Sequence, residues 1–289
     1  MSADPVSAAD VATELVLYAA CLPGVPFRNY VDAASQAGFD AVTIWPLMYR
    51  RALSREGLSP QSIVSVVEDA GLKLLDLDPI GVWLPDSGAG ADEPATFRSV
   101  WERRQFFDVA EALGIESLVA VSLGADRVEP EVAIEGFADL CDDAAEHGLT
   151  VGLEFMPFSG IPDLESALRI VRGADRPNGG LVFDLWHLHR SGGDRSLFDQ
   201  LDPELVFCVQ LSDGPSAAEA DLREEAMWSR RPPGDGSFDL AGDLLALAER
   251  GVRTRVGPEL YLRGFSEREP LTVARELMAA TRRVLGTDS

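Results

Sequence analysis

The chain has 289 residues, which would suffice for two average domains, although α/β barrels of this length routinely form one domain around one core. Its hydrophobic fraction of 46% is ordinary for a globular protein. The formal charge of −23 comes from 25 basic and 48 acidic residues and would repel a nucleic-acid backbone unless a local basic groove overcame it. The sequence shows no such groove, so we expect no nucleic-acid partner.

Apolar segments alternate with segments of helical periodicity along the whole chain. In chain order, the pattern predicts strands and helices in pairs: 15–20 with 27–38, 41–45 with 60–70, 74–80 with 95–113, 118–123 with 130–147, 150–156 with 164–172, 181–185 with 197–201, 205–211 with 238–250, and 254–260 with 271–285. A loop rich in Gly, Asp and Pro is expected at 81–94. Several predicted helices end at a glycine, the residue most common at a helix C-terminus: Gly38, Gly71, Gly114, Gly148 and Gly251.

Strands that are apolar on both faces, each followed by a helix, are what a parallel sheet buried on both sides requires. Eight such units in succession predict a (β/α)₈ TIM barrel, class α/β, as a single domain over 1–289 with a flexible N-terminal tail at 1–12. The competing open, doubly wound sheet would normally carry a G-x-G-x-x-G motif after its first strand, and none is present there.

Several other functions are disfavoured by single residue types. Lys73 is the only lysine and begins a predicted strand, at the wrong end of a barrel for a Schiff-base aldolase. The three cysteines lie in apolar segments, as buried thiols in a reducing compartment do. The start of the chain has no secretory signal, and the longest apolar stretch, 15–27, is broken by Pro and Gly and falls short of the about 20 residues of a membrane span. We expect a cytoplasmic protein with no membrane partner; a homo-oligomer stays open.

Polar residues stand at the ends of the last four predicted strands, where a barrel carries its chemistry. They are Glu154 in V-G-L-E-F, Asp184 in L-V-F-D-L-W-H, Gln210 in C-V-Q-L-S-D and Glu259 in V-G-P-E-L-Y. Three converging carboxylates would repel one another and raise their pKa values unless a cation neutralised them. We therefore predict a divalent-metal site from these four residues. Any one of them alone could instead bond loop backbone or pair with an arginine.

Three carboxylates and one amide oxygen form a hard ligand set, which favours Mg²⁺ or Mn²⁺ over Zn²⁺, with Co²⁺ also compatible. The sequence does not distinguish between these metals.

The chain resembles the xylose isomerase-like barrel superfamily, specifically its sugar phosphate isomerase/epimerase group, over nearly its whole length. The resemblance rests on the four strand-end residues, on the F-D-L-W-H run and on the R-R-P-P-G-D-G-S-F-D loop. It implies that Glu154 and Glu259 are also the acid/base pair, and that His187 and Arg231 contact the substrate. Many sugar epimerases have His at the position of Gln210. Gln at this position resembles what is found in hydroxypyruvate isomerases and 3-dehydroshikimate dehydratases.

Other side chains near the predicted strand ends receive weaker interpretations. Trp45 could form an apolar wall of the pocket, although a tryptophan there is more often plain core. Asp213 follows Gln210 by three residues and is interpreted as supporting the metal ligands, with a loop cap as the alternative. For Arg230, a substrate contact and a surface ion pair are equally plausible. His189 is expected in a solvated loop.

The leading functional hypothesis is a metal-dependent isomerase or epimerase acting on an α-hydroxy ketone or aldehyde of polyhydroxylated type. One glutamate would remove the proton next to the carbonyl, and the other would return it to a different atom or face. The alternative is a dehydratase of the 3-dehydroshikimate or inosose type, in which the same enolate expels a β-hydroxyl group. A DNA repair endonuclease fits poorly because the chain is acidic and has three histidines. A non-enzymatic binding barrel is the least favoured reading.

Overall fold

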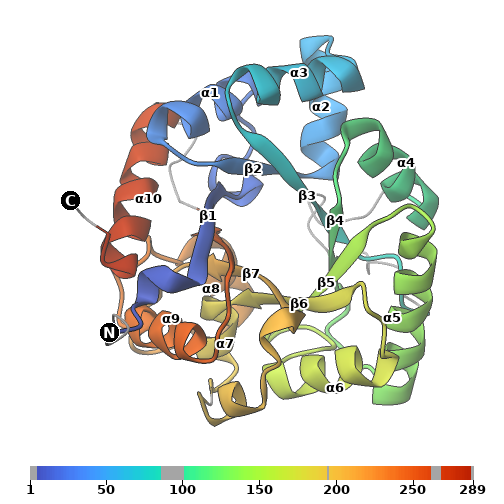
Figure 1. Ribbon diagram of the computed structural model, residues 1–289, viewed down its shortest axis with the longest axis vertical. Coiled ribbons are helices and arrows are strands. Elements are labelled where there is room, and N and C mark those ends of the chain that lie inside the picture. The colour runs from blue at the N-terminus through green and yellow to red at the C-terminus, as the bar shows by residue number, and fades with distance from the viewer. Residues whose placement is uncertain (1–4, 86–100, 194, 262–267, 288–289) are drawn as a thin grey trace.

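The computed structural model describes residues 5–85, 101–193, 195–261 and 268–287. Eight parallel strands, β1 to β8, form a closed barrel in sequence order, and helices surround it (Figure 1). The predicted fold class is therefore confirmed. The strands are Ala12–Leu17, Ala41–Ile44, Lys73–Ile80, Ser117–Val121, Thr150–Glu154, Gly179–Asp184, Val206–Leu211 and Thr254–Pro258.

The outer layer is helical. Within the described residues the α-helices α1 to α10 are Phe27–Ala37, Pro46–Glu56, Pro60–Asp69, Arg103–Leu113, Pro130–Ala145, Leu164–Ala174, Leu185–Arg190, Leu222–Trp228, Leu240–Glu249 and Pro270–Leu285. Part of the predicted helix 95–113 and of the predicted loop 81–94 lies outside the described residues. None of the described helices is both long and apolar enough to cross a membrane.

The glycines behind the predicted helix ends fulfil the expected role. Gly38 and Gly114 follow α1 and α4 directly, have φ values of 88° and 65°, and donate their N–H groups to carbonyls of the last helical turn. This left-handed conformation costs glycine little because it lacks a Cβ atom. Each helix therefore stops at a fixed residue and the chain turns back to the next strand.

Side chains alternate across each strand, so residues two apart point to the same side. On β3 the inward positions carry Asp76 and Asp78, whereas Leu77 between them packs in the large apolar cluster between strands and helices. Parallel pairing of β6 with β7 places Asp184 opposite Gln210. The register thus brings polar strand ends to one height at one mouth of the barrel.

Three sequence-based expectations need correction. The proposed tail 1–12 is ordered where it is described: Ala8–Val11 is a 3₁₀ turn with Val11 fully buried, and Ala12 begins β1. The predicted helix 197–201 is a 3₁₀ segment, Arg195–Gln200. Helices α2, α7 and α8 were not predicted; α7 and α8 have only six and seven residues, and α2 is rich in polar side chains.

Candidate active site

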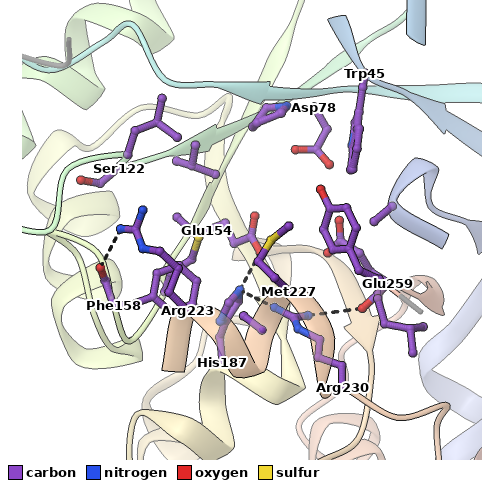
Figure 2. A pocket seen from close by; sticks show the side chains of 18 residues that line it. Trp45, Asp78, Ser122, Glu154, Phe158, His187, Arg223, Met227, Arg230 and Glu259 are labelled. Carbon is purple, nitrogen blue, oxygen red and sulfur yellow. Dashed lines mark hydrogen bonds and ion pairs between the residues drawn. The ribbon is translucent and has the colours of Figure 1, made fainter. Parts of the chain in front are cut away.

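A pocket opens at the carboxyl ends of the strands (Figure 2). Its acidic lining residues come from three different strand ends: Asp78 from β3, Glu154 from β5, and Glu259 directly after β8. The basic lining residues are His187, Arg223 and Arg230. Apolar and aromatic side chains complete the wall, including Trp45, Met156, Phe158, Met227 and Tyr261.

The four predicted metal ligands are all at this mouth, but they are not equivalent. Glu154 and Glu259 line the pocket, whereas Asp184 and Gln210 are buried among the neighbouring groups, with 1% and no exposure. Among the described Asp, Glu, His and Cys residues, those whose ligand atoms lie within 4.8 Å of one another are Glu154, Asp184 and His187. The structure thus places His187, expected as a substrate contact, with two of the predicted ligands.

Helix α7 explains the position of His187. Asp184 is the N-cap of α7, and its Oδ1 accepts the backbone N–H of His187 at 3.0 Å. The imidazole Nε2 then lies 3.3 Å from Glu154 Oε1 and 3.7 Å from Asp184 Oδ2. One short helical turn therefore fixes both the carboxylate and the imidazole.

Arg230 lies among the acidic groups. Its Nη1 donates to Asp184 Oδ2 at 2.8 Å and to the Glu259 carbonyl oxygen at 3.3 Å, and its Nη2 is 3.1 Å from His187 Nε2. The guanidinium also stacks 4.5 Å from the Trp186 ring centroid, and 8% of the side chain is exposed. Arg230 thus supplies the positive charge that three neighbouring carboxylates require.

Burial and charge shift the acidities in this pocket. Burial raises the pKa of Glu259 well above its usual range, and the charges of Glu154 and Asp78 add to the effect. Burial also opposes ionisation of Asp184, but the charges of Arg230 and His187 outweigh it and hold the pKa of Asp184 below its usual value. Two neighbouring carboxyl groups therefore differ in their readiness to hold a proton.

The donor set fits a divalent cation. Among the described residues, neither the amide oxygen nor the amide nitrogen of fully buried Gln210 has a hydrogen-bond partner. An unpartnered buried amide is costly, and its oxygen is a suitable ligand for a hard cation. Gln210 stands opposite Asp184 in the pairing of β6 with β7, and Asp184 in turn lies in one group with Glu154 and His187.

Asp78 is an acidic residue of the pocket that was not predicted from the sequence. It is 4% exposed, and burial, followed by the charge of Glu154, raises its pKa well above the usual range. The signal was present: Asp78 stands in L-D-L-D-P, two residues before the end of the third predicted strand, as Glu154 does in the fifth.

Arg231 and Asp213 have other positions than expected. Their backbones form an antiparallel bridge, and Arg231 is exposed, with Nη1 3.5 Å from the Asp235 carbonyl oxygen. Adjacent residues of an extended segment point to opposite sides, so Arg230 enters the pocket and Arg231 does not. The Asp213 carboxylate accepts backbone N–H groups of Gly214, Gly234 and Phe238, as a loop cap does. It organises the R-P-P-G-D-G loop that carries Arg230.

Two further predictions concern aromatic and imidazole groups. Trp45 lines the pocket, is 8% exposed, and packs against Tyr261 with ring centroids 5.6 Å apart, so it forms part of the wall. The loop prediction for His189 is wrong: it lies in α7, its Nε2 is 2.7 Å from Asp243 Oδ2, and its ring stacks on Phe238.

A family model for the xylose isomerase-like TIM barrel matches residues 31–284. The chain belongs to this family. The resemblance inferred from the strand-end motifs is therefore confirmed at the level of the xylose isomerase-like barrel.

Curated relatives of this xylose isomerase-like chain include two kinds of enzyme. A 3-dehydroshikimate dehydratase of Pseudomonas aeruginosa is 30% identical over 238 residues, which cover 81% of this chain and 36% of the dehydratase. An inosose isomerase of Bacillus velezensis is 30% identical over 178 residues, 59% of this chain and 62% of the isomerase. The chain therefore spans little more than a third of the first relative and less than two thirds of the second.

Solved structures share the xylose isomerase-like architecture. The structure of the IOLI protein with a bound zinc atom superimposes with a TM-score of 0.83 at 22% identity, covering 95% of this chain and 98% of that protein. At this identity the likeness shows the fold. Both curated relatives are named as enzymes, one a dehydratase and the other an isomerase.

Proposed function

We propose that the protein is a divalent-metal-dependent enzyme that removes a proton next to the carbonyl group of a small polyhydroxylated ketone or aldehyde and returns it as an isomerase or epimerase. The observation that carries this proposal is the placement of Glu154 and Glu259, from β5 and the end of β8, in one largely buried pocket beside an acidic group suited to a metal. Two carboxyl groups in one pocket allow one to accept a proton while the other donates.

Glu154, Asp184 and Gln210 would hold the metal, with His187 or Glu259 as a further ligand. When bound, the cation would act as a Lewis acid that polarises the substrate carbonyl and stabilises negative charge on its oxygen. The zinc atom in the IOLI protein supports a metal in this type of barrel. The oxygen-rich donors of this chain favour Mg²⁺ or Mn²⁺.

The remaining steps belong to the protein's own side chains. One glutamate takes the proton from the carbon next to the carbonyl, and the other delivers a proton to the neighbouring carbon or to the opposite face. Trp45 and Tyr261 form an aromatic wall on the side of Glu259, which limits water access to the reacting carbon. His187, held by Asp184, can donate or accept a hydrogen bond at a substrate hydroxyl group.

A second candidate is elimination of a β-hydroxyl group from the same enolate. It is favoured by the dehydratase relative, whose match covers more of this chain than that of the inosose isomerase. The two outcomes are separated by ultraviolet absorption, because elimination creates a carbonyl conjugated to a double bond and epimerisation does not.

The test is a screen of free and phosphorylated ketoses, inososes and 3-dehydroshikimate with Mg²⁺, Mn²⁺ or Co²⁺ supplied separately, with deuterium incorporation from solvent measured by NMR. For the compound that reacts, Glu259→Gln should lower exchange by roughly 100-fold or more, as expected for loss of an acid/base group. Glu249→Gln, an exposed glutamate on α9, is the control and should exchange normally. Near wild-type exchange in Glu259→Gln would overturn the assignment.

The binding-module alternative predicts that metal changes nothing. Metal analysis of protein purified without chelator, and thermal unfolding with and without EDTA, test this directly. Absence of both bound metal and an EDTA effect would count against the metal-dependent enzyme.

A further inference from the structure

The carboxyl group of Asp78 reaches the same pocket from β3, whereas Asp184 ends β6. Asp78 lies in the second half of β3, is 4% exposed, and lines the pocket with Glu154 and Glu259. Figure 2 shows its carboxyl group beside Trp45, directed toward the interior of the pocket. Asp78 therefore adds a third carboxyl group to the pocket lining beyond the proposed glutamate pair.

Structural roles explain other buried acids of the molecule but not this one. Two residues earlier on the same face, Asp76 forms an ion pair with Arg255 and thereby stabilises the barrel interior. Across the described part of the chain, no arginine, lysine or histidine makes an ion pair with Asp78. The side chain of Trp45 lies beside its carboxyl group (Figure 2). A buried carboxyl group without a neighbouring cation destabilises the fold, so we expect Asp78 to have a function in the pocket.

Asp78 also differs from the residues suited to the metal. Glu154, Asp184 and His187 place ligand atoms within 4.8 Å of one another, and Asp78 is not part of this group. Because it lines the pocket without joining that group, its carboxyl group faces the space left for substrate. Burial favours its neutral form, which is the form that can donate a proton.

We propose that Asp78 is a catalytic residue that transfers a proton to or from an oxygen atom of the substrate. The proposal rests on the proposed function, in which the glutamates move protons at carbon. A reaction that shifts a carbonyl or expels a hydroxyl group also needs a proton transfer at oxygen, and the glutamate pair is already engaged. Asp78 supplies that further group.

In an elimination, the step balances as follows. A glutamate takes the proton from the carbon next to the carbonyl, the C–H electron pair forms the new C=C bond, and the C–O bond to the β-hydroxyl breaks. The departing oxygen takes the Asp78 proton and leaves as water. The glutamic acid then releases its proton to solvent, and the Asp78 carboxylate is reprotonated from solvent. In an aldose–ketose shift, Asp78 instead relays the hydroxyl proton to the former carbonyl oxygen. Neither course needs an oxidant or reductant.

The experiment compares two rates in Asp78→Asn with the reactive compound and metal from the screen: solvent-deuterium exchange at carbon, and net conversion. We expect exchange within about threefold of wild type and conversion lowered by roughly 100-fold or more, chiefly in kcat. Asp69→Asn, at the exposed end of the helix that precedes β3, is the control and should match wild type in both rates. Parallel loss of both rates, or loss of neither, overturns the role of Asp78.

A second variant guards against a folding defect. In Asp78→Ala, added formate should restore conversion in proportion to its concentration while leaving the exchange rate unchanged; lack of restoration in folded protein contradicts the proposal. If wild type with each metal shows neither exchange nor conversion, the proposed function itself fails and the role of Asp78 falls with it. An inactive wild type can be told apart from a wrong role for Asp78, because the tests of Asp78 are made only with a wild type that is active.

Discussion

Replacing Arg230 by methionine tests whether this guanidinium takes the place of a metal charge in the pocket. Arg230 donates to Asp184 Oδ2 at 2.8 Å, is 8% exposed, and stacks on Trp186. Methionine keeps a long unbranched chain against the indole ring but carries no charge. The substitution therefore removes the positive charge with little loss of apolar contact.

In metal-free protein, the change leaves the buried carboxylate of Asp184 without the cation that pairs with it. Breaking a buried pair on one side costs about 3–5 kcal/mol, which lowers the melting temperature of a chain of this size by roughly 6–20 °C. A bound divalent cation restores the missing charge. The variant should therefore gain about 2 kcal/mol more than wild type from saturating metal, because binding to the folded state alone stabilises it.

The assay is urea unfolding of both proteins in EDTA and in MnCl₂. Arg231→Met is the matched control: Arg231 is the adjacent arginine, exposed and outside the pocket, and its loss should cost less than about 0.5 kcal/mol in either condition. An equal loss for Arg230→Met with and without metal would refute the reasoning, as would a control that behaves like the variant.

Two further predictions concern the fold. Gly257→Ala should unfold the protein or cost more than about 4 kcal/mol in urea unfolding, because the added Cβ would overlap a backbone carbonyl of β1, whereas Gly124→Ala, where the Cβ meets open space, should be nearly neutral. Burial raises the pKa of the Cys141 thiol to about 12, so the neutral thiol stabilises the folded state below its unfolded pKa of about 8.5, and that stability is lost as pH rises toward 12. Between pH 7.5 and 9.5, wild type should lose about 1 kcal/mol more than Cys141→Ala, and equal losses would contradict this account.

Most of the barrel could be predicted because its pattern of strands and helices repeats. A run of apolar residues, however, shows that a segment is buried and does not show that it is a strand. The first strand was placed at 15–20, whereas β1 ends at Leu17 and Ala19–Cys21 is a buried 3₁₀ turn. Helix α8 was not predicted because its inward face carries Glu225, a buried acid. Its Oε1 accepts a hydrogen bond from Arg190 Nε at 2.6 Å. A buried ion pair appears as a polar residue in the sequence, so periodicity does not reveal it.

The strand-end acids could be predicted because a barrel gathers all eight strand ends at one mouth. Which arginine of the R-R pair enters the pocket could not be predicted. Arg230 and Arg231 are chemically identical in the sequence, and their directions depend on the bridge that Arg231 makes with Asp213, whose backbone groups exchange two hydrogen bonds of 2.8 Å. That bridge is a contact between distant segments and leaves no local signal.

Among the described residues, two groups of charged side chains inside the barrel differ in their balance of charge. The layer deeper in the barrel contains Asp76 and Arg255, one charge of each sign, and needs no further ion. The layer at the mouth contains four carboxyl groups around Arg230 and His187: those of Asp78, Glu154 and Asp184 are buried, and that of Glu259 is partly buried. Protonation of some carboxyls or binding of a cation can correct this excess. Proton transfer next to a carbonyl group requires carboxyl groups that can bind and release protons and a positive charge that polarises the carbonyl. A site that binds either protons or a metal ion meets both requirements.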